Sequence, residues 1–276
     1  MTSVGDHCIN LNYPTASVNE PRWGYGRARH PLLYEIIDRG RKDYQEVLHR
    51  FLNYKDKYLA ISRREDDKTP LEPHLTTPWL PGLDSLALYS MLPIREPATY
   101  IEIGSGSSTK FARRSIRDNS LETEVVSIDS APRGDIDAIC DQVLRKPLEE
   151  VDCSFFDQLE ANDILFVDSS HRCFMNSDVT VIFLDVLPRL RPGVVVEIHD
   201  VFLPDDYPPS WAQRYYRQQY LLAAYILAEG QGFDVLLPNG FFSKDPQLHE
   251  TLSPIFSAPD MSGVRSGGGS FWLRMK

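Results

Sequence analysis

The feature that most constrains the fold is an alternation of short apolar runs and helical segments after Pro97. The apolar runs read "TYIEI", "EVVSID", a weaker "DQVLR", "DILFVD", "VVVEIHD", "FDVLL" and "SFWLRMK". Strands that alternate with helices form a mainly parallel sheet covered on both faces. The connection 239–266 contains no helix of obvious crossover length, so the last strand is expected to enter antiparallel. The sequence therefore predicts an α/β, doubly wound, mostly parallel sheet with an antiparallel last strand.

Three segments between these runs have helical spacing: "SSTKFARRSI", "NSDVTVIFLDVLPRL" and "WAQRYYRQQYLLAAYILAE". In the second segment the apolar residues share one helix face, and Asn176 or Ser177 is placed to cap it. Asp178 is expected to be an acidic residue of that helix's first turn rather than a ligand.

Residues 1–97 have a different character. Residues 1–30 are expected to form an arm or loop, and helical spacing extends from Leu32 to Ile61 with a break at Gly40. After a polar linker, a turn at Pro81–Gly82 precedes a short helix. We therefore expect a helical N-terminal extension over 1–97, which also forms a lid, and a second domain over 98–276.

Charge and composition exclude several classes of protein. The formal net charge is −10, which disfavours a non-specific nucleic-acid binder. No apolar run approaches the roughly 18 residues of a membrane span. The first residues lack the pattern of a secretory signal, and the four cysteines form no close CxxC pair. We expect a cytoplasmic protein with reduced thiols and a small-molecule partner, without a nucleic-acid or membrane partner.

The stretch "TYIEIGSGSST" predicts a ligand-binding turn after the first strand of the sheet. Gly104 and Gly106 allow a close approach of the backbone to a ligand. The dinucleotide-binding motif has a third glycine at the position of Thr109 in this chain, so the turn is less suited to binding a pyrophosphate. Glu102 is placed to meet a cationic group of a ligand. Asp129, at the end of the second strand, is placed to bind both hydroxyls of a ribose.

A cation, a ribose and no phosphate together describe S-adenosylmethionine. The residues expected to bind it are those of the turn and of the strand ends: Glu102, Gly104, Ser105, Gly106, Thr109, Asp129 and Asp168.

The region from Thr99 to Lys276 resembles the class I S-adenosylmethionine-dependent methyltransferases. "IEIGSGSST" is similar to the acidic–glycine motif of that family, "VVSID" to its second motif, and "LPRLRPGVVVEIHD" to its Leu-x-Pro-Gly turn and following strand. The resemblance implies a Rossmann-like sheet of seven strands with an antiparallel last strand. It also implies that residues 1–97 are a variable extension over the substrate site.

Two acids and two histidines follow the fourth and fifth strands: Asp168, His171, His199 and Asp200. This "DxxH…HD" pattern is similar to a small-molecule subfamily that includes cephalosporin-type and macrolide-type O-methyltransferases. Relatives resembling catechol O-methyltransferase hold magnesium with carboxylates at these strand ends. Here His199 replaces a carboxylate, and magnesium prefers oxygen ligands. A divalent metal on Asp168, His199 and Asp200 therefore stays open, beside metal-free base catalysis by His171 or His199 with Asp168.

Aromatic and basic residues are expected to wall the acceptor pocket, with Trp79 on one side and Tyr207, Trp211 and Arg214 on the other. His74 is expected to be an ordinary loop residue. The sequence predicts methyl transfer to a hydroxyl or carboxyl oxygen of a small molecule. Two alternatives stay open: an NAD-dependent oxidoreductase, and a non-catalytic binding protein on this fold. The substrate, nitrogen or carbon as acceptor atom, and a homodimeric state are also open.

Overall fold

One sheet forms the centre of the molecule in the computed structural model, which describes residues 20–132, 134–228 and 232–276. Within these residues the sheet has seven strands in the order β3-β2-β1-β4-β5-β7-β6. β7 is antiparallel to β5 and to β6, and the other pairs are parallel. The predicted doubly wound, Rossmann-like sheet with an antiparallel last strand is confirmed. The strands are β1 (Thr99–Ile103), β2 (Glu124–Ile128), β3 (Gln142–Leu144), β4 (Ile164–Val167), β5 (Val195–Ile198), β6 (Phe233–Pro238) and β7 (Phe271–Met275).

The strand order reverses beside β1, whose neighbours are β2 on one side and β4 on the other. Every residue of β4 and β5 is buried, as expected for strands with helices on both faces. In open α/β sheets, ligands bind beyond the carboxyl ends of the strands at this reversal. The fold therefore predicts a ligand-binding site at the residues that follow β1, β2, β4 and β5.

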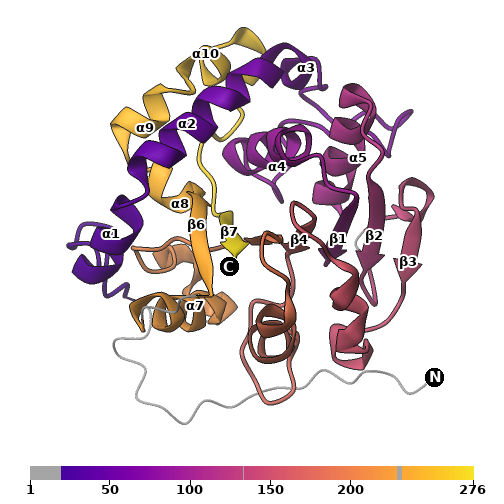
Figure 1. Ribbon diagram of the computed structural model, residues 1–276. Helices are drawn as coiled ribbons and strands as arrows, with labels where there is room; N and C mark the ends of the chain where they lie inside the picture. The colour runs from indigo at the N-terminus through magenta and orange to yellow at the C-terminus, as the bar shows by residue number, and fades with distance from the viewer. Residues whose placement is uncertain (1–19, 133, 229–231) are drawn as a thin grey trace.

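Helices cover both faces of the sheet, with α4 and α5 on one face and α7 on the other (Figure 1). The helices of the first half are α1 (Pro31–Asp38), α2 (Arg41–Phe51), η1 (Leu52–Tyr54), α3 (Lys55–Leu59), α4 (Gly82–Arg95) and α5 (Ser107–Asn119). The predicted break at Gly40 is confirmed, because this residue separates α1 from α2. The helix after Pro81 spans 14 residues and is therefore longer than expected.

The helical segments of the second half differ in detail from the expected ones. Ser177 caps the run that starts at Asp178, as predicted, by accepting a hydrogen bond from the Thr180 N–H. The helix expected from Trp211 starts only at Gln218, because Tyr215 takes a left-handed backbone conformation with a φ of +55°. The remaining segments are η2 (Asp137–Ile139), η3 (Leu148–Glu150), η4 (Cys153–Gln158), α6 (Asp178–Val181), η5 (Ile182–Val186), η6 (Leu187–Arg189), η7 (Pro209–Arg214), α7 (Gln218–Leu227), α8 (Asn239–Phe242), α9 (Pro246–Glu250), α10 (Ser253–Phe256) and η8 (Pro259–Met261).

The N-terminal helices share one hydrophobic core with the sheet. Leu48 of α2, Leu88 of α4 and Val196 of β5 belong to the same buried cluster. All residues of α4 from Gly82 to Leu92 are buried. The expected boundary at residue 97 therefore falls between two elements, α4 and β1, that contribute to a common core.

No helix within the described ranges combines the length and the apolar character needed to cross a bilayer. Cys140, Cys153 and Cys173 are free thiols. Cys8 and most of the expected arm over 1–30 lie outside the described residues, and a cytoplasmic location stays a prediction.

Asp84 of α4 ties this helix to the end of the chain. Its carboxylate accepts hydrogen bonds from the backbone N–H groups of Gly269 (2.7 Å) and Ser270 (2.9 Å), just before β7. It also accepts from the Asn239 side-chain amide at 2.8 Å. The side chain is 1 % exposed. One buried carboxylate thus satisfies three donors from two segments of the second half of the chain.

We predict that Asp84→Ala lowers the free energy of unfolding by about 3 kcal/mol or more, because each buried donor left without a partner costs about 1–3 kcal/mol. Urea unfolding followed by circular dichroism measures this change. Glu46→Ala, at an exposed position of α2, is the control and should change the free energy by less than about 0.5 kcal/mol. Equal stability of the Asp84 variant and the wild type would contradict this role.

Candidate functional site

The turn after β1 touches the end of β4 through Gly104. This residue has a φ of +82°, and a Cβ built on it would lie 1.9 Å from the carbonyl oxygen of Asp168. Its N–H donates to the carbonyl of Ile128 at 3.0 Å, at the end of β2. Only glycine suits both the backbone conformation and the available space. Gly104 therefore brings the ends of three neighbouring strands together.

Glu102 supports this turn from inside the protein. Its carboxyl group is fully buried and accepts hydrogen bonds from the hydroxyls of Thr109 and of Tyr100 (3.3 Å). The Gly106 N–H in turn donates to the Thr109 hydroxyl at 3.0 Å. Burial raises the pKa of Glu102 to about 8. Thr109, which stands in the position of a third glycine, thus links the acid to the turn, a role that sequence reasoning missed.

Two cavities flank the turn and share Ser105 and Asp168 in their linings. The β2 cavity, of about 380 Å³, is also lined by Gly104 and Asp129. The α5 cavity, of about 360 Å³, is also lined by Gly106. Neither lining includes Glu102 or Thr109.

Asp129 lines the β2 cavity, and backbone N–H groups fix the position of its carboxylate. One of its carboxylate oxygens accepts from the Ser105 N–H and the other from the Ala131 N–H, both at 2.8 Å. The residues 146–149, which follow the weak strand β3, line the same cavity. Sequence reasoning did not select them, although the end of that strand was the available signal.

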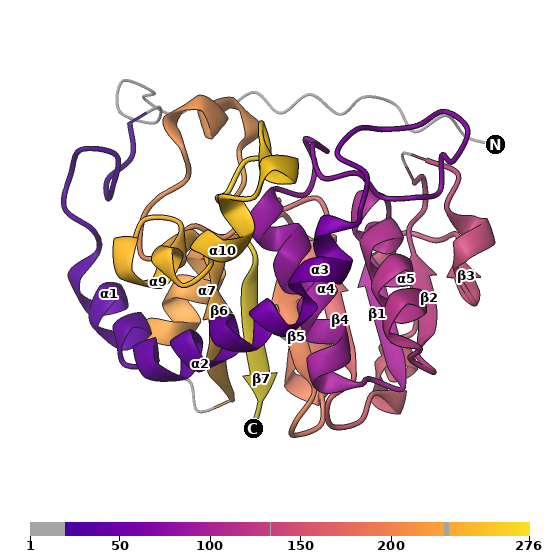
Figure 2. The same cartoon turned by 90° about the horizontal axis from the view of Figure 1, so that it is seen from above.

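The segment 60–81 lies over the carboxyl ends of the neighbouring strands and forms the outer wall of the α5 cavity (Figure 2). The Thr77 and Ser107 hydroxyls are 3.0 Å apart, and the Lys110 ammonium donates to the Pro70 carbonyl at 2.6 Å. Trp79 is 56 % exposed and lines this cavity, as does His74, which was expected to be an ordinary loop residue.

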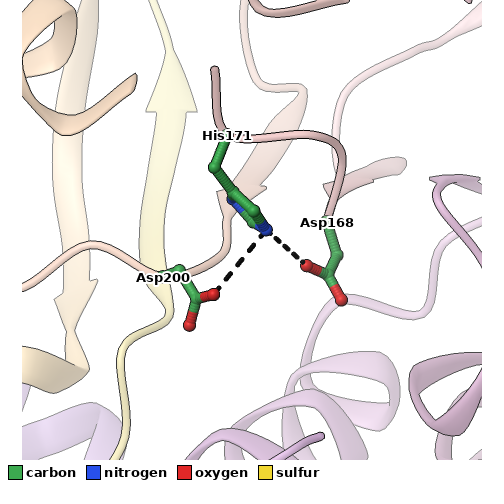
Figure 3. Close-up of side chains that lie close together, drawn as sticks. All are labelled: Asp168, His171 and Asp200. Atoms are coloured by element: carbon green, nitrogen blue, oxygen red, sulfur yellow. Dashed lines mark ion pairs between the residues drawn. The ribbon is translucent and has the colours of Figure 1, made fainter. Parts of the chain in front are cut away.

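Asp168, His171 and Asp200 form a compact cluster beyond β4 and β5 (Figure 3). Nε2 of His171 lies 3.2 Å from a carboxylate oxygen of Asp168 and 3.6 Å from one of Asp200. His171 is 4 % exposed and has a φ of +59°. The structure thus groups His171, rather than His199, most closely with the two acids.

Gln218, the first residue of α7, holds His171 from the other side. Its side-chain nitrogen lies 2.7 Å from Nδ1 of His171 and donates to the His199 carbonyl as well. The backbone N–H groups of Arg217 and Gln218 donate to the His171 carbonyl. Gln218 was not among the residues selected from the sequence, and no local pattern would have singled it out.

His199 is buried one layer deeper, at 2 % exposure. Its Nδ1 lies 3.2 Å from Glu197 and 3.3 Å from the Ser270 hydroxyl, and its Nε2 lies 3.8 Å from Asp200. Burial alone would lower the pKa of His199, but the carboxylates of Asp168, Glu197 and Asp200 outweigh it and raise the pKa well above its ordinary value. The surrounding carboxylates therefore favour the protonated form of His199.

The four residues expected to wall an acceptor pocket do not line one cavity. Tyr207 and Trp211 line a separate cavity of about 170 Å³, whereas Trp79 lines the α5 cavity. Arg214 stacks on Trp211, with its guanidinium carbon 3.8 Å from the ring centroid. Tyr216 lines the same cavity as Tyr207 and Trp211, and its ring centroid is 4.4 Å from that of His171.

Residues 101–201 match the family model of a methyltransferase domain. This segment contains the glycine turn, the end of β2, and the Asp168–His171–Asp200 cluster. No curated protein matches the chain.

Several solved structures are similar to the chain at low identity. A methyltransferase from Podospora anserina with bound SAH has 18 % identity, covers 88 % of this chain and 96 % of its own, and gives a TM-score of 0.42. The O-methyltransferase TomG from Streptomyces achromogenes, in complex with SAM, has 16 % identity, 81 % and 95 % coverage, and a TM-score of 0.43. An O-methyltransferase from Bacillus cereus in complex with SAH has 16 % identity, 83 % and 90 % coverage, and a TM-score of 0.39.

The family match over residues 101–201 and the strand order, rather than these distant likenesses, support the assignment of this part of the chain. Residues 101–201 form a methyltransferase domain, and the strand order is the one implied by the resemblance to class I S-adenosylmethionine-dependent methyltransferases.

We predict that Gly104→Ala lowers the free energy of unfolding by about 3 kcal/mol or more, because a Cβ would collide with the Asp168 carbonyl and the backbone is left-handed. The measurement is thermal and urea unfolding. Gly134→Ala is the matched control, since a Cβ there meets no atom within 4 Å. The assignment fails if both alanine variants are equally stable.

We predict that Glu102→Gln makes stability less dependent on pH between about 5 and 8. The pKa of Glu102 is about 8 in the folded protein and near 4.5 when unfolded. Between these values the folded state holds a proton that the unfolded state lacks, so the wild type loses stability as the pH rises. Urea unfolding at a series of pH values measures the slope. Identical slopes for both proteins would show that Glu102 titrates normally.

Proposed function

We propose that this protein transfers the methyl group of S-adenosylmethionine to a hydroxyl or carboxyl oxygen of a small molecule. The observation that carries the proposal is the position of Asp168. This residue lines both cavities at the glycine turn and also belongs to the cluster with His171 and Asp200. One side chain therefore joins the cavities proposed for the cofactor to the groups proposed for the chemistry.

The β2 cavity suits the nucleoside part of the cofactor. Asp129 lies at the end of β2, where a carboxylate accepts hydrogen bonds from both ribose hydroxyls. The amino-acid part would then extend past Ser105 and Asp168 into the α5 cavity, beside the start of α5. The first N–H groups of a helix are free to bind a carboxylate. Glu102 acts in this proposal by shaping the turn, since it lines neither cavity.

The main contribution of the protein to this reaction is to align three atoms: the acceptor oxygen, the methyl carbon and the sulfur. An oxygen lone pair of the acceptor attacks the methyl carbon, the bond from carbon to sulfur breaks, and sulfur keeps the electron pair as the sulfonium becomes a thioether. Positioning and exclusion of water account for much of such a rate enhancement. A hydroxyl acceptor also loses a proton, and we propose that the Asp168–His171–Asp200 cluster receives it.

A divalent metal was considered at Asp168, Asp200 and His199. Magnesium prefers an all-oxygen set, and one imidazole among two carboxylates suits a transition metal better. The raised pKa of His199 also favours its protonated form, in which Nε2 has no lone pair for a cation. These residues fit magnesium poorly, and no step of the proposed reaction passes through a metal.

We expect S-adenosylmethionine and S-adenosylhomocysteine to bind in isothermal titration calorimetry, and Asp129→Asn to weaken that binding by about tenfold or more, since a good hydrogen bond to a charged group is worth about 1.5–3 kcal/mol. Asp137→Asn, at an exposed acid outside both linings, is the control. Binding of NADH without binding of S-adenosylmethionine would favour an oxidoreductase, and no binding of either would favour a non-catalytic protein.

The chemistry is tested by release of S-adenosylhomocysteine with a panel of hydroxyl, carboxyl and amine acceptors, with and without EDTA. Full turnover in both His171→Ala and His199→Ala would show that neither histidine is needed for methyl transfer. A loss of turnover in EDTA, restored by one divalent metal, would overturn the metal-free form of the proposal.

A further inference from the structure

The side-chain amide of Gln218 is held in one orientation by its surroundings. Gln218 is fully buried, and its amide nitrogen faces the His199 carbonyl oxygen and Nδ1 of His171. A carbonyl oxygen can only accept a hydrogen bond, so the group that faces it must donate. If the amide were turned over, its oxygen would face the His199 carbonyl at hydrogen-bond distance, and two acceptors would repel each other.

The amide nitrogen, rather than the oxygen, therefore faces the His199 carbonyl. In this orientation the Gln218 oxygen remains a buried acceptor, inaccessible to solvent and without a hydrogen-bond partner among the described residues. One amide hydrogen therefore goes to the His199 carbonyl and the other to Nδ1 of His171.

We propose that Gln218 is a positioning residue that fixes the tautomer of His171, with Nδ1 as hydrogen-bond acceptor and the ring proton on Nε2. A neutral imidazole carries one proton, so acceptance at Nδ1 places that proton on the opposite nitrogen. Nε2 faces Asp168 at 3.2 Å and Asp200 at 3.6 Å. The proton thus lies between two acids that would otherwise repel each other.

This assignment deepens the proposed function and rests on it for its catalytic meaning. With its proton on Nε2, His171 donates a hydrogen bond and has no lone pair there for a substrate proton or a metal ion. Asp168, which lines both cavities, is then the group that receives the proton of the acceptor hydroxyl. His171 keeps that carboxylate oriented and stabilises its charged form.

The test uses the whole chain labelled with ¹⁵N-histidine and long-range ¹H–¹⁵N correlation spectra, in which protonated and unprotonated ring nitrogens have well-separated shifts. His171→Asn identifies the His171 signals by their loss. We expect the wild type to show an unprotonated Nδ1 and a protonated Nε2 at His171. Any spectrum with a proton on Nδ1 of His171 would overturn the proposal.

Gln218→Glu offers Nδ1 an acceptor in place of a donor, so the proton should move to Nδ1. Gln219→Glu is the matched control, because the neighbouring buried glutamine uses its side-chain oxygen to accept from the Phe202 N–H and should leave the His171 pattern unchanged. An unchanged tautomer in a folded Gln218→Glu variant would also overturn the proposal. If that variant does not fold, the wild-type spectrum still decides.

A kinetic measurement on the preferred acceptor tests the catalytic meaning. Gln218→Glu should lower kcat by about tenfold or more, while the Kd of S-adenosylhomocysteine stays within about twofold. The spectrum requires no turnover, so a failure of the tautomer assignment and a failure of the methyl-transfer proposal give separate results. If the Gln218→Glu variant has a switched tautomer but the full kcat, the tautomer of His171 does not contribute to catalysis.

Discussion

The contact between the glycine turn and the end of β4 is the constraint on which the rest of the site depends. A missing side chain at Gly104 lets the backbone of one strand end approach the Asp168 carbonyl of the next. That approach positions Asp168 between the two cavities and beside His171. A bulkier residue would separate β1 from β4 at the point where strand order reverses, and the shared wall of the two cavities would be lost.

A second buried pair of titratable residues, Glu197 and His199, lies next to the Asp168–His171–Asp200 cluster. Glu197 lies in β5 and His199 directly follows that strand; they are 0 % and 2 % exposed, and each offsets the cost of burying the other. Burial raises the pKa of Glu197 to about 7. On its other side, Nε2 of His199 lies 3.8 Å from Asp200 of the cluster. A short and otherwise apolar strand thus carries a buried Glu197–His199 pair next to the place where chemistry is proposed.

Much of the fold could be predicted from the sequence, because its signals are local. The alternation of apolar runs with helical segments indicates the sheet, and even the weak run "DQVLR" is a strand. The cap at Ser177 and the break at Gly40 follow from local backbone chemistry in the same way. The late start of α7 does not, since it depends on the left-handed Tyr215 and on contacts with the distant His171.

The candidate site was predictable only in part, for the same physical reason. Strand ends can be located in a sequence, so Gly104, Asp129 and Asp168 could be selected. The contacts between them cannot be located in this way. Glu102 was expected to face a ligand but hydrogen-bonds Thr109 inside the turn. Gln218 comes from a helix about 50 residues beyond β4, and only the folded chain brings it to His171.

The burial of α4 has a consequence for how such a protein can change over evolutionary time. Its first N–H groups, at Gly82 and Leu83, donate to the carbonyls of Arg265 and Gly267, close to the other end of the chain. Because α4 contacts both the sheet and the segment that precedes β7, it cannot be replaced by an unrelated helix without the loss of these contacts. New acceptor preferences would therefore arise more readily by variation at the exposed positions of the 60–81 segment, such as Trp79, than by replacement of the helices that precede the sheet.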